Sequence, residues 1–169
     1  MNKAVAQLDE LVLRRPCAND GAAIHALIAA SPPLDTNTVY AYLLLAQYFS
    51  DTCILAVRGD DIAGFISGFI VPQRDDTLFI WQVAGHPDER GKGLALLMLE
   101  RLLEEQKAKG LRFIETTVSP DNQGSRALFK SLARRYGVPL TESALFDCAL
   151  FGGQSHEAEP LLRLGPFSK

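Results

Sequence analysis

Apolar and polar residues follow two different spacings along this chain, and each spacing predicts one kind of element. Short apolar runs that end at turn residues predict strands, whereas apolar positions three and four residues apart predict amphipathic helices. The runs predict strands at 11–15, 53–58, 62–71, 77–84, 112–118, within 143–151 and at 161–164. The helical spacing predicts helices at about 19–30, 36–49, 91–109 and 120–136.

Turn residues separate these elements and fix their order. Ser31-Pro32-Pro33 ends the first helix, because proline lacks a backbone donor and restricts the residue before it. Gly59-Asp60-Asp61 joins two strands in a predicted hairpin. The resulting order is one strand, two helices, three strands, a helix, a strand, a helix and two strands. Such an order predicts an α/β chain with a mixed central sheet and helices on both of its faces.

Composition limits the class of protein. With 169 residues, 47% of them hydrophobic and 22% charged, we expect a single domain over residues 1–169. A net charge of −3 argues against a nucleic-acid partner, since nucleic-acid binders normally have a basic face. Residues 1–9 lack the apolar core of a secretory signal, and no stretch approaches the roughly 20 apolar residues that span a bilayer. We therefore expect a cytoplasmic protein with no membrane partner. The cysteines lie far apart without zinc-ligand spacing, so no metal site is expected.

One turn combines the features of an anion-binding site. A strand ending at Ala84 is followed by Gly85 and Pro87, and a helix begins behind Arg90-Gly91-Lys92-Gly93. The first N–H groups of a helix lack intrahelical partners, the helix dipole favours negative charge there, and glycines let a phosphate approach the backbone. A P-loop would need Lys-Ser or Lys-Thr, and a dinucleotide-binding turn would need three glycines in another register. The turn therefore predicts a site for a pyrophosphate-bearing cofactor.

The order Arg-x-x-Gly-x-Ala in this turn resembles the acetyl-CoA pyrophosphate loop of the GNAT N-acetyltransferases. Together with the element order, the resemblance covers nearly the whole chain. It implies the GNAT fold, a mixed and mostly antiparallel sheet flanked by helices, and acetyl-CoA as co-substrate. The residues that it implies for cofactor binding are Val83, Ala84, Gly85, Arg90, Gly91, Lys92, Gly93, Leu94, Ala95, Asn122, Ser125 and Phe129.

Phe129 departs from the GNAT pattern. Many GNAT enzymes have a tyrosine at the matching position, where its hydroxyl can protonate the departing CoA thiolate. Phe129 has no hydroxyl, so another donor such as Tyr136 or water serves, or the thiolate leaves unprotonated. A thiol with a pKa of ~8.5 makes the last route reasonable, because its anion is a tolerable leaving group.

Further runs resemble one branch of this superfamily, the L-2,4-diaminobutyrate acetyltransferases of ectoine biosynthesis. The runs lie at 33–37, 40–44, 78–84, 115–118 and 122–125. The branch implies transfer of an acetyl group from acetyl-CoA to the γ-amine of L-2,4-diaminobutyrate by direct attack in a ternary complex. GNAT enzymes of this type are often homodimers, so a homodimer is expected.

The same resemblance suggests residues for the amine substrate. Asp35 would accept the α-ammonium in a charge-assisted bond, with Tyr40 and Trp81 as walls of the pocket. An alkylammonium with a pKa of ~10 must lose a proton before it attacks, and Glu115 and His156 are the candidate acceptors of that proton. The expected substrate-binding set is Asp35, Tyr40, Trp81, Glu115, Thr117, His156 and Glu159.

Simpler interpretations stay open for several of these residues. Asn122 can cap a helix, Glu115 can be a solvated strand-edge carboxylate, and Trp81 can belong to the core. His156 and Glu159 can be ordinary surface residues of a polar loop. Two other functions also stay open: a GNAT enzyme for another primary amine, such as a polyamine, and a non-catalytic acyl-CoA-binding module that contacts a protein partner.

Overall fold

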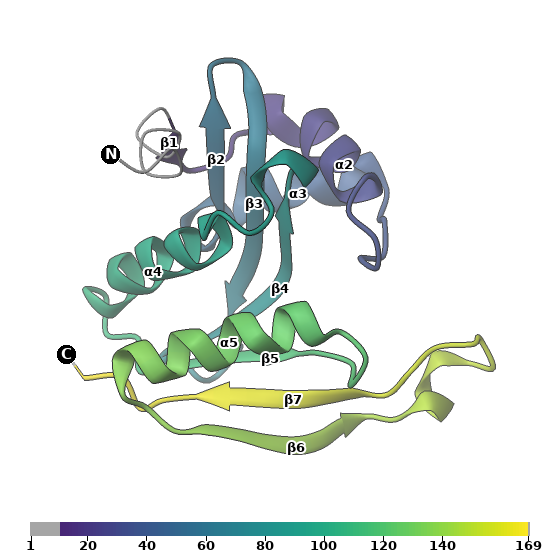
Figure 1. Ribbon diagram of the computed structural model, residues 1–169, viewed down its shortest axis with the longest axis vertical. Helices are drawn as coiled ribbons and strands as arrows, with labels where there is room; N and C mark the ends of the chain where they lie inside the picture. Colours follow the sequence, from purple (N-terminus) through teal and green to yellow (C-terminus); the bar gives the residue numbers. More distant parts are fainter. Residues whose placement is uncertain (1–10, 169) are drawn as a thin grey trace.

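The computed structural model describes residues 11–168, and one seven-stranded sheet runs through this part of the chain (Figure 1). The strands are β1 (Val12–Arg14), β2 (Ile54–Arg58), β3 (Asp61–Ile70), β4 (Thr77–Gly85), β5 (Phe113–Thr117), β6 (Leu140–Phe146) and β7 (Glu159–Leu164). Their order across the sheet is β1-β2-β3-β4-β5-β7-β6, and only the neighbours β4 and β5 are parallel. The prediction of a mixed, mostly antiparallel sheet is confirmed.

Helices cover both faces of the sheet. They are α2 (Gly21–Ala29), α3 (Val39–Tyr48), α4 (Leu94–Lys107) and α5 (Gln123–Tyr136). Phe65 and Ile66 are successive residues of β3, so their side chains point to opposite faces. Ile66 belongs to the core cluster that includes residues of α4 and α5, whereas Phe65 belongs to the cluster that includes residues of α2 and α3. The predicted arrangement of helices on both faces is therefore confirmed.

The predicted order of elements is also confirmed, but two boundaries differ for identifiable reasons. Helix α4 begins at Leu94 rather than near residue 91, because Gly91 and Gly93 have left-handed φ values of 73° and 82°. Strand β6 begins at Leu140 and ends at Phe146, and residues 148–151 form the short 3-10 helix η4 (Cys148–Phe151). The Asp147 carboxylate starts η4 by accepting hydrogen bonds from the two backbone N–H groups at 149 and 150.

The parallel pairing at the centre of the sheet is short. Strand β4 pairs with β5 only at Thr77–Phe113, Leu78–Ile114 and Phe79–Glu115. Beyond Phe79 the two strands diverge, which is the separation that the family resemblance implied. The register of β4 against β3 also shifts there, and Trp81 has no direct partner on β3. The irregular centre of the sheet is therefore where β4 is free to contact other groups.

The expectations of no secretory signal, no membrane span and no metal site were made for the whole sequence, whereas the structure describes residues 11–168. The absence of a secretory signal was expected from residues 1–9, which lie outside residues 11–168. Within residues 11–168 no helix is long and apolar enough to cross a membrane. The same residues contain no group of three or more His, Cys, Asp or Glu side chains that could hold a metal ion.

Candidate functional site

Two adjoining cavities open where β4 and β5 diverge. The larger cavity, of about 880 Å³, lies between β4, the end of β5 and the segment that links β6 to β7. The smaller cavity, of about 500 Å³, lies between the end of β4, the start of α4 and one side of α5. Residues that line both are Pro33, Leu34, Val83, Asn122 and Ser125. The two cavities therefore form one continuous depression.

The smaller cavity contains the glycine turn that the sequence singled out. A Cβ placed on Gly91 or Gly93 would meet no atom within 4 Å, so the backbone there borders open space. The first turn of α4 follows at once, and its N–H groups have no intrahelical partner. Residues of the turn that line this cavity are Arg90, Gly91, Gly93, Leu94 and Ala95. Free N–H groups, a helix N-terminus and a guanidinium together fit a pyrophosphate.

The edge of β4 offers backbone groups to the same cavity. The His86 N–H donates to the Ala63 carbonyl of β3 at 2.8 Å, and in an antiparallel ladder alternate residues bond the partner strand. His86 and Ala84 therefore face β3, whereas Val83 and Gly85 direct their N–H and C=O groups toward the diverging β5. All three of Val83, Ala84 and Gly85 line the smaller cavity. An extended chain of amides fits this edge as an added strand would.

The start of α5 borders both cavities. Asn122 Oδ1 accepts a hydrogen bond from the Ser125 N–H at 3.1 Å, so Asn122 caps the helix, and both residues still line the two cavities. Phe129, one turn later, is buried and lines the larger cavity. Tyr136 lies at the other end of α5, where its hydroxyl donates to Glu104 at 2.9 Å. Burial and this bond to a carboxylate raise the Tyr136 pKa to about 12, and Tyr136 lines neither cavity.

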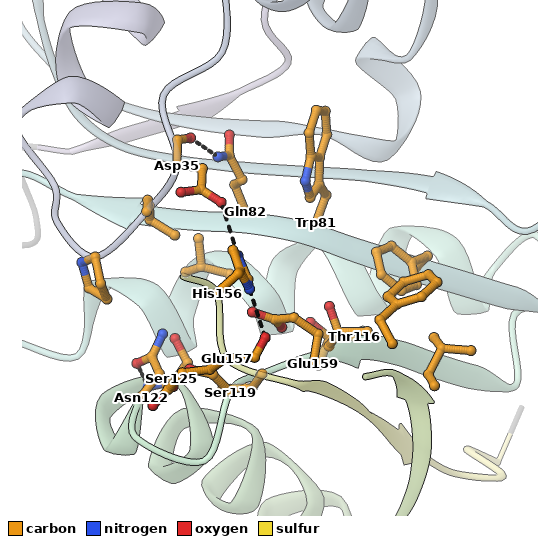
Figure 2. Close-up of a pocket in the computed structure, with 18 of the residues that line it drawn as sticks. Asp35, Trp81, Gln82, Thr116, Ser119, Asn122, Ser125, His156, Glu157 and Glu159 are labelled. Carbon is orange, nitrogen blue, oxygen red and sulfur yellow. Dashed lines mark hydrogen bonds and ion pairs between the residues drawn. The ribbon is translucent and has the colours of Figure 1, made fainter. Parts of the chain in front are cut away.

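The larger cavity brings together side chains from distant parts of the sequence (Figure 2). Asp35 from the loop before α3, Trp81 from β4, Thr117 from β5, and His156 and Glu159 from the approach to β7 all line it. His156 Nε2 lies 3.6 Å from Asp35 Oδ2, across the opening between the two segments. Glu157 lines the same cavity, so three carboxylates and an imidazole border one space, which suits an ammonium substrate.

The tautomer of His156 follows from its hydrogen bond. Nδ1 lies 2.7 Å from the Glu157 carbonyl oxygen, which can only accept, so Nδ1 bears the hydrogen. The neutral ring then has its lone pair on Nε2, the atom that faces Asp35. The Glu157 carbonyl, followed by the charges of Asp35 and Glu159, raises the His156 pKa above its ordinary value, against a lowering by burial. His156 can therefore accept a proton on the side that faces the cavity.

Comparisons with known proteins point to one family. Residues 22–133 match the model of the acetyltransferase (GNAT) family. The L-2,4-diaminobutyric acid acetyltransferase of Bordetella parapertussis is 49% identical over 92% of this chain and 84% of its own length. That of Shouchella clausii is 44% identical over 96% of this chain and 90% of its own length. The chain belongs to the diaminobutyric acid acetyltransferases of the GNAT family.

Solved structures agree with this membership. The diaminobutyrate acetyltransferase of Paenibacillus lautus, in complex with its substrate L-2,4-diaminobutyric acid and coenzyme A, has a TM-score of 0.90 and 45% identity. The match covers 95% of this GNAT chain and 97% of that one. A Salmonella typhimurium acetyltransferase with acetyl-CoA, 19% identical over 94% and 95% of the two chains, shares the fold with a TM-score of 0.70. The predicted GNAT fold is confirmed.

Glu115 lines neither cavity of this GNAT acetyltransferase, contrary to the prediction. Glu115 lies on the same face of β5 as Thr117 and is paired in register with Phe79 of β4, and both of those residues line the larger cavity. There the Glu115 carboxylate accepts hydrogen bonds from Arg74, at 2.7 and 2.9 Å, and from Arg163. Burial would raise the Glu115 pKa, but the two guanidinium groups outweigh burial and lower it. A carboxylate held in this way is a poor proton acceptor, so Glu115 is not the group that we assign to deprotonate the amine.

Two more predicted residues lie outside both cavities. Tyr40 is 67% exposed, because the buried side of α3 contains Tyr42, and a residue two positions earlier lies about 200° away around the helix. The Lys92 ammonium lies 3.7 Å from the Glu89 carboxylate and lines neither cavity. Tyr40 therefore does not form a wall of the pocket as predicted. Lys92 does not line the smaller cavity, and it adds only a positive charge near the turn.

Sequence reasoning missed several residues of the larger cavity. The apolar part of the lining includes five residues that the sequence did not predict: Phe69, Phe79, Leu145, Phe146 and Phe151. The Phe151 ring stacks on that of His156 with 3.8 Å between centroids. The apolar run at 143–151 was the available signal, because it is followed by a polar loop that includes His156. Gln82 also lines the cavity, and its signal was a single amide in an otherwise apolar strand.

Proposed function

We propose that this chain transfers the acetyl group of acetyl-CoA to the γ-amine of L-2,4-diaminobutyrate, giving N4-acetyl-L-2,4-diaminobutyrate and CoA. The reaction is a step in making the compatible solute ectoine. The observation on which the proposal rests is the junction of the two cavities at Val83, with an anion-binding turn on one side and Asp35, His156 and Glu159 on the other. The solved relative from Paenibacillus lautus holds L-2,4-diaminobutyric acid and coenzyme A together.

The smaller cavity would hold the donor. The N–H groups of the turn and the Arg90 guanidinium bind the pyrophosphate, and the free edge at Val83 and Gly85 pairs with the pantetheine amides. Asn122 and Ser125 adjoin the same arm at the start of α5. A backbone N–H of β4 directed into the opening polarises the thioester carbonyl and stabilises the negative charge that develops on its oxygen.

The larger cavity would hold the amine. Asp35 and Glu159 bind ammonium groups of the diamino acid, and Trp81 with Thr117 borders the carbon chain. An amine with a pKa of ~10 is mostly charged at neutral pH, although the neighbouring α-ammonium lowers that value by repulsion. His156 Nε2 removes a γ-ammonium proton, and the freed lone pair forms the new C–N bond.

The donor's C–S bond then breaks, and its electron pair leaves with sulfur. Phe129 has no proton to give, and the Tyr136 hydroxyl is committed to Glu104 outside both cavities. The thiolate therefore leaves unprotonated or takes its proton from water. This route is accessible because a thiol has a pKa of only ~8.5.

A panel of amines tests this proposal. Purified protein with acetyl-CoA should acetylate L-2,4-diaminobutyrate faster than ornithine, lysine or polyamines, and the product should bear the acetyl group on the γ-nitrogen. Diaminobutyrate turnover no faster than that of ornithine or lysine would contradict the choice of substrate and favour another primary amine. CoA binding without turnover of any amine would instead favour a non-catalytic acyl-CoA-binding module.

We also propose that the protein is a homodimer, as the resemblance implies. Strand β6 lies at the edge of the sheet, and Leu150, in η4 just after it, is 65% exposed. Leu145 and Phe146, at the end of β6 beside the larger cavity, are each 44% exposed. Apolar side chains on an exposed edge strand are normally covered by a partner. Sedimentation equilibrium at micromolar concentration should give twice the mass of the chain. A monomer mass at every concentration would contradict the dimer and leave acetyl transfer untouched.

The remaining parts of the proposal concern organisation and location. We propose one domain over residues 1–169, supported by a single sheet that includes strands from Val12 to Leu164. We propose that the protein works in the cytoplasm, where its acetyl-CoA donor is available. Fractionation of cells that produce the protein should recover it with cytoplasmic markers, and recovery with membranes or outside the cell would contradict the location.

A further inference from the structure

Gln82 is a buried polar residue whose backbone N–H and two side-chain amide atoms are all hydrogen-bonded. It is 4% exposed, in the part of β4 that follows the bulge. Its backbone N–H donates to Ser67 Oγ at 3.2 Å, its Oε1 accepts from the Tyr42 hydroxyl at 3.2 Å, and its Nε2 donates to the Asp35 carbonyl at 2.8 Å. A buried amide with these partners is held in one orientation, because any rotation leaves polar groups unpaired.

Tyr42 extends this network to a second point on the same loop. Its side chain is fully buried in α3, and its hydroxyl oxygen also accepts from the Asn37 N–H at 3.3 Å. The loop before α3 is thus attached at the carbonyl of Asp35 and at the N–H of Asn37. Both attachments lead to Gln82, which lies one residue from Val83 at the junction of the two cavities.

The Asp35 carboxylate depends on this attachment for its position. Its side chain is 85% exposed, and it approaches His156 only at 3.6 Å. Little packing therefore restrains the carboxylate directly, and its place over the larger cavity follows from the main chain that Gln82 holds (Figure 2). A substrate bound at Asp35 must reach the donor beside Val83, so the separation of these two points selects the length of the substrate.

We propose that Gln82 is a specificity-determining positioning residue that fixes the reach from Asp35 to the reacting end of the donor. The inference rests on the proposed function and deepens it. Diaminobutyrate and ornithine differ by one methylene between their amines, and a pocket can discriminate one methylene by roughly 10–200-fold. With the loop fixed, the shorter diamino acid places its γ-nitrogen at the thioester, and the longer one does not fit without displacing the loop.

Gln82→Met tests the inference, because methionine has a similar shape without the amide. Tyr42→Phe removes only the hydroxyl and serves as a second variant if Gln82→Met folds poorly. Gln106→Met is the matched control: Gln106 is also buried, and its Nε2 donates to a carbonyl, that of Asp51, at 2.6 Å, yet it lines neither cavity. The measurements are kcat/KM for diaminobutyrate and ornithine, KM for acetyl-CoA, and Tm.

Gln82→Met should lower the preference for diaminobutyrate over ornithine by about fivefold or more, within the discrimination that one methylene permits. Tyr42→Phe should also lower the preference for diaminobutyrate, by a smaller factor. Gln106→Met should have a lower Tm and an unchanged preference. The KM for acetyl-CoA should stay within about twofold in all three, since the donor contacts are elsewhere. Unchanged preference in both Gln82→Met and Tyr42→Phe would overturn the inference. Wild-type protein without any preference for diaminobutyrate would overturn the proposed function itself.

Discussion

At the scale of single residues, the proposed proton transfer depends on the His156 imidazole and the groups that surround it. The Glu157 carbonyl fixes the hydrogen on Nδ1, and the carboxylates of Asp35 and Glu159 favour the charged ring. These neighbours raise the His156 pKa, so the ring is protonated up to a higher pH than an ordinary histidine. Since only the neutral ring can take a proton from the substrate, activity should be lost as pH falls through this raised pKa.

The first prediction is a pH profile. The acid limb of kcat/KM for diaminobutyrate should lie above about pH 6.5, the ordinary pKa of histidine. Asp35→Asn should move that limb to lower pH, because it removes a negative charge that favours the imidazolium. His156→Gln should abolish the limb and lower kcat by roughly a hundredfold, as expected for loss of a general base. Retention of the same limb and near-normal kcat in His156→Gln would assign the proton transfer to another group.

The second prediction separates binding of the amine from binding of the donor. Asp35→Ala should raise KM for diaminobutyrate roughly tenfold, because it removes a charge-assisted hydrogen bond, and should leave KM for acetyl-CoA unchanged. Asp88→Ala is a matched control, since Asp88 is equally exposed and also lies 3.6 Å from a histidine, His86, but lines neither cavity. An equal rise of both KM values in Asp35→Ala would indicate disrupted folding rather than a lost contact.

At the scale of elements, the decisive feature is the passage from β4 through the glycine turn into α4. Alternating pairing with β3 leaves the backbone of Val83 and Gly85 free, and the left-handed glycines place the start of α4 beside the same cavity. The sequence predicted this passage well, because glycine spacing and helix initiation are local properties. Val83 and Gly85, which the family resemblance named for cofactor binding, line the smaller cavity.

The third prediction concerns the glycine turn. Gly93→Val should raise KM for acetyl-CoA tenfold or more, because a side chain would occupy the space in which a phosphate approaches the backbone. Valine at φ 82° is also strained by about 1–2 kcal/mol. Gly137→Val bears the same kind of strain, at φ 62° at the end of α5, without lining either cavity. Normal cofactor kinetics in a folded Gly93→Val protein would contradict the assignment of the turn.

Elements whose boundaries depend on tertiary contacts were predicted less well. The apolar run at 143–151 suggested a strand, but Asp147 ends β6 and begins η4 by accepting two backbone hydrogen bonds. Pairing with β7 extends β6 back to Leu140, which lies before the run. Neither effect is visible in the spacing of apolar residues, since the cap depends on side-chain geometry and the extension depends on a partner strand.

At the scale of the whole molecule, Glu115 links parts of the sheet that are far apart in sequence. Arg74 lies in the turn between β3 and β4, and Arg163 lies in β7, so one carboxylate of β5 joins both neighbours of its strand. The sequence suggested a catalytic role because Glu115 belongs to a run typical of the family. Strand alternation places Glu115 on the same face as Thr117, but it cannot reveal the arginine partners, which come from segments 41 and 48 residues away.

The fourth prediction follows from this arrangement. Glu115→Gln should lower the free energy of unfolding at pH 7 by about 1–2 kcal/mol, since the arginine partners are partly exposed, while kcat of the folded protein stays near normal. The folded-state pKa of Glu115 is lowered, so its contribution is present above the unfolded pKa of about 4.3 and is lost as pH falls through the folded value. Urea denaturation at pH 7 and pH 3 measures this difference, which should be smaller at the lower pH. A large loss of kcat with unchanged stability would contradict this prediction and indicate that Glu115 takes part in catalysis.

The lining shared by the two cavities has a consequence for the order of events. Because Val83, Asn122 and Ser125 border both spaces, an occupant of the smaller cavity becomes part of the boundary of the larger one. If the cavities hold donor and amine as proposed above, the amine site is complete only when the donor is bound. By thermodynamic reciprocity, a bound amine must in turn strengthen retention of the donor by the same factor. Departure of CoA then removes that boundary and favours release of the acetylated product.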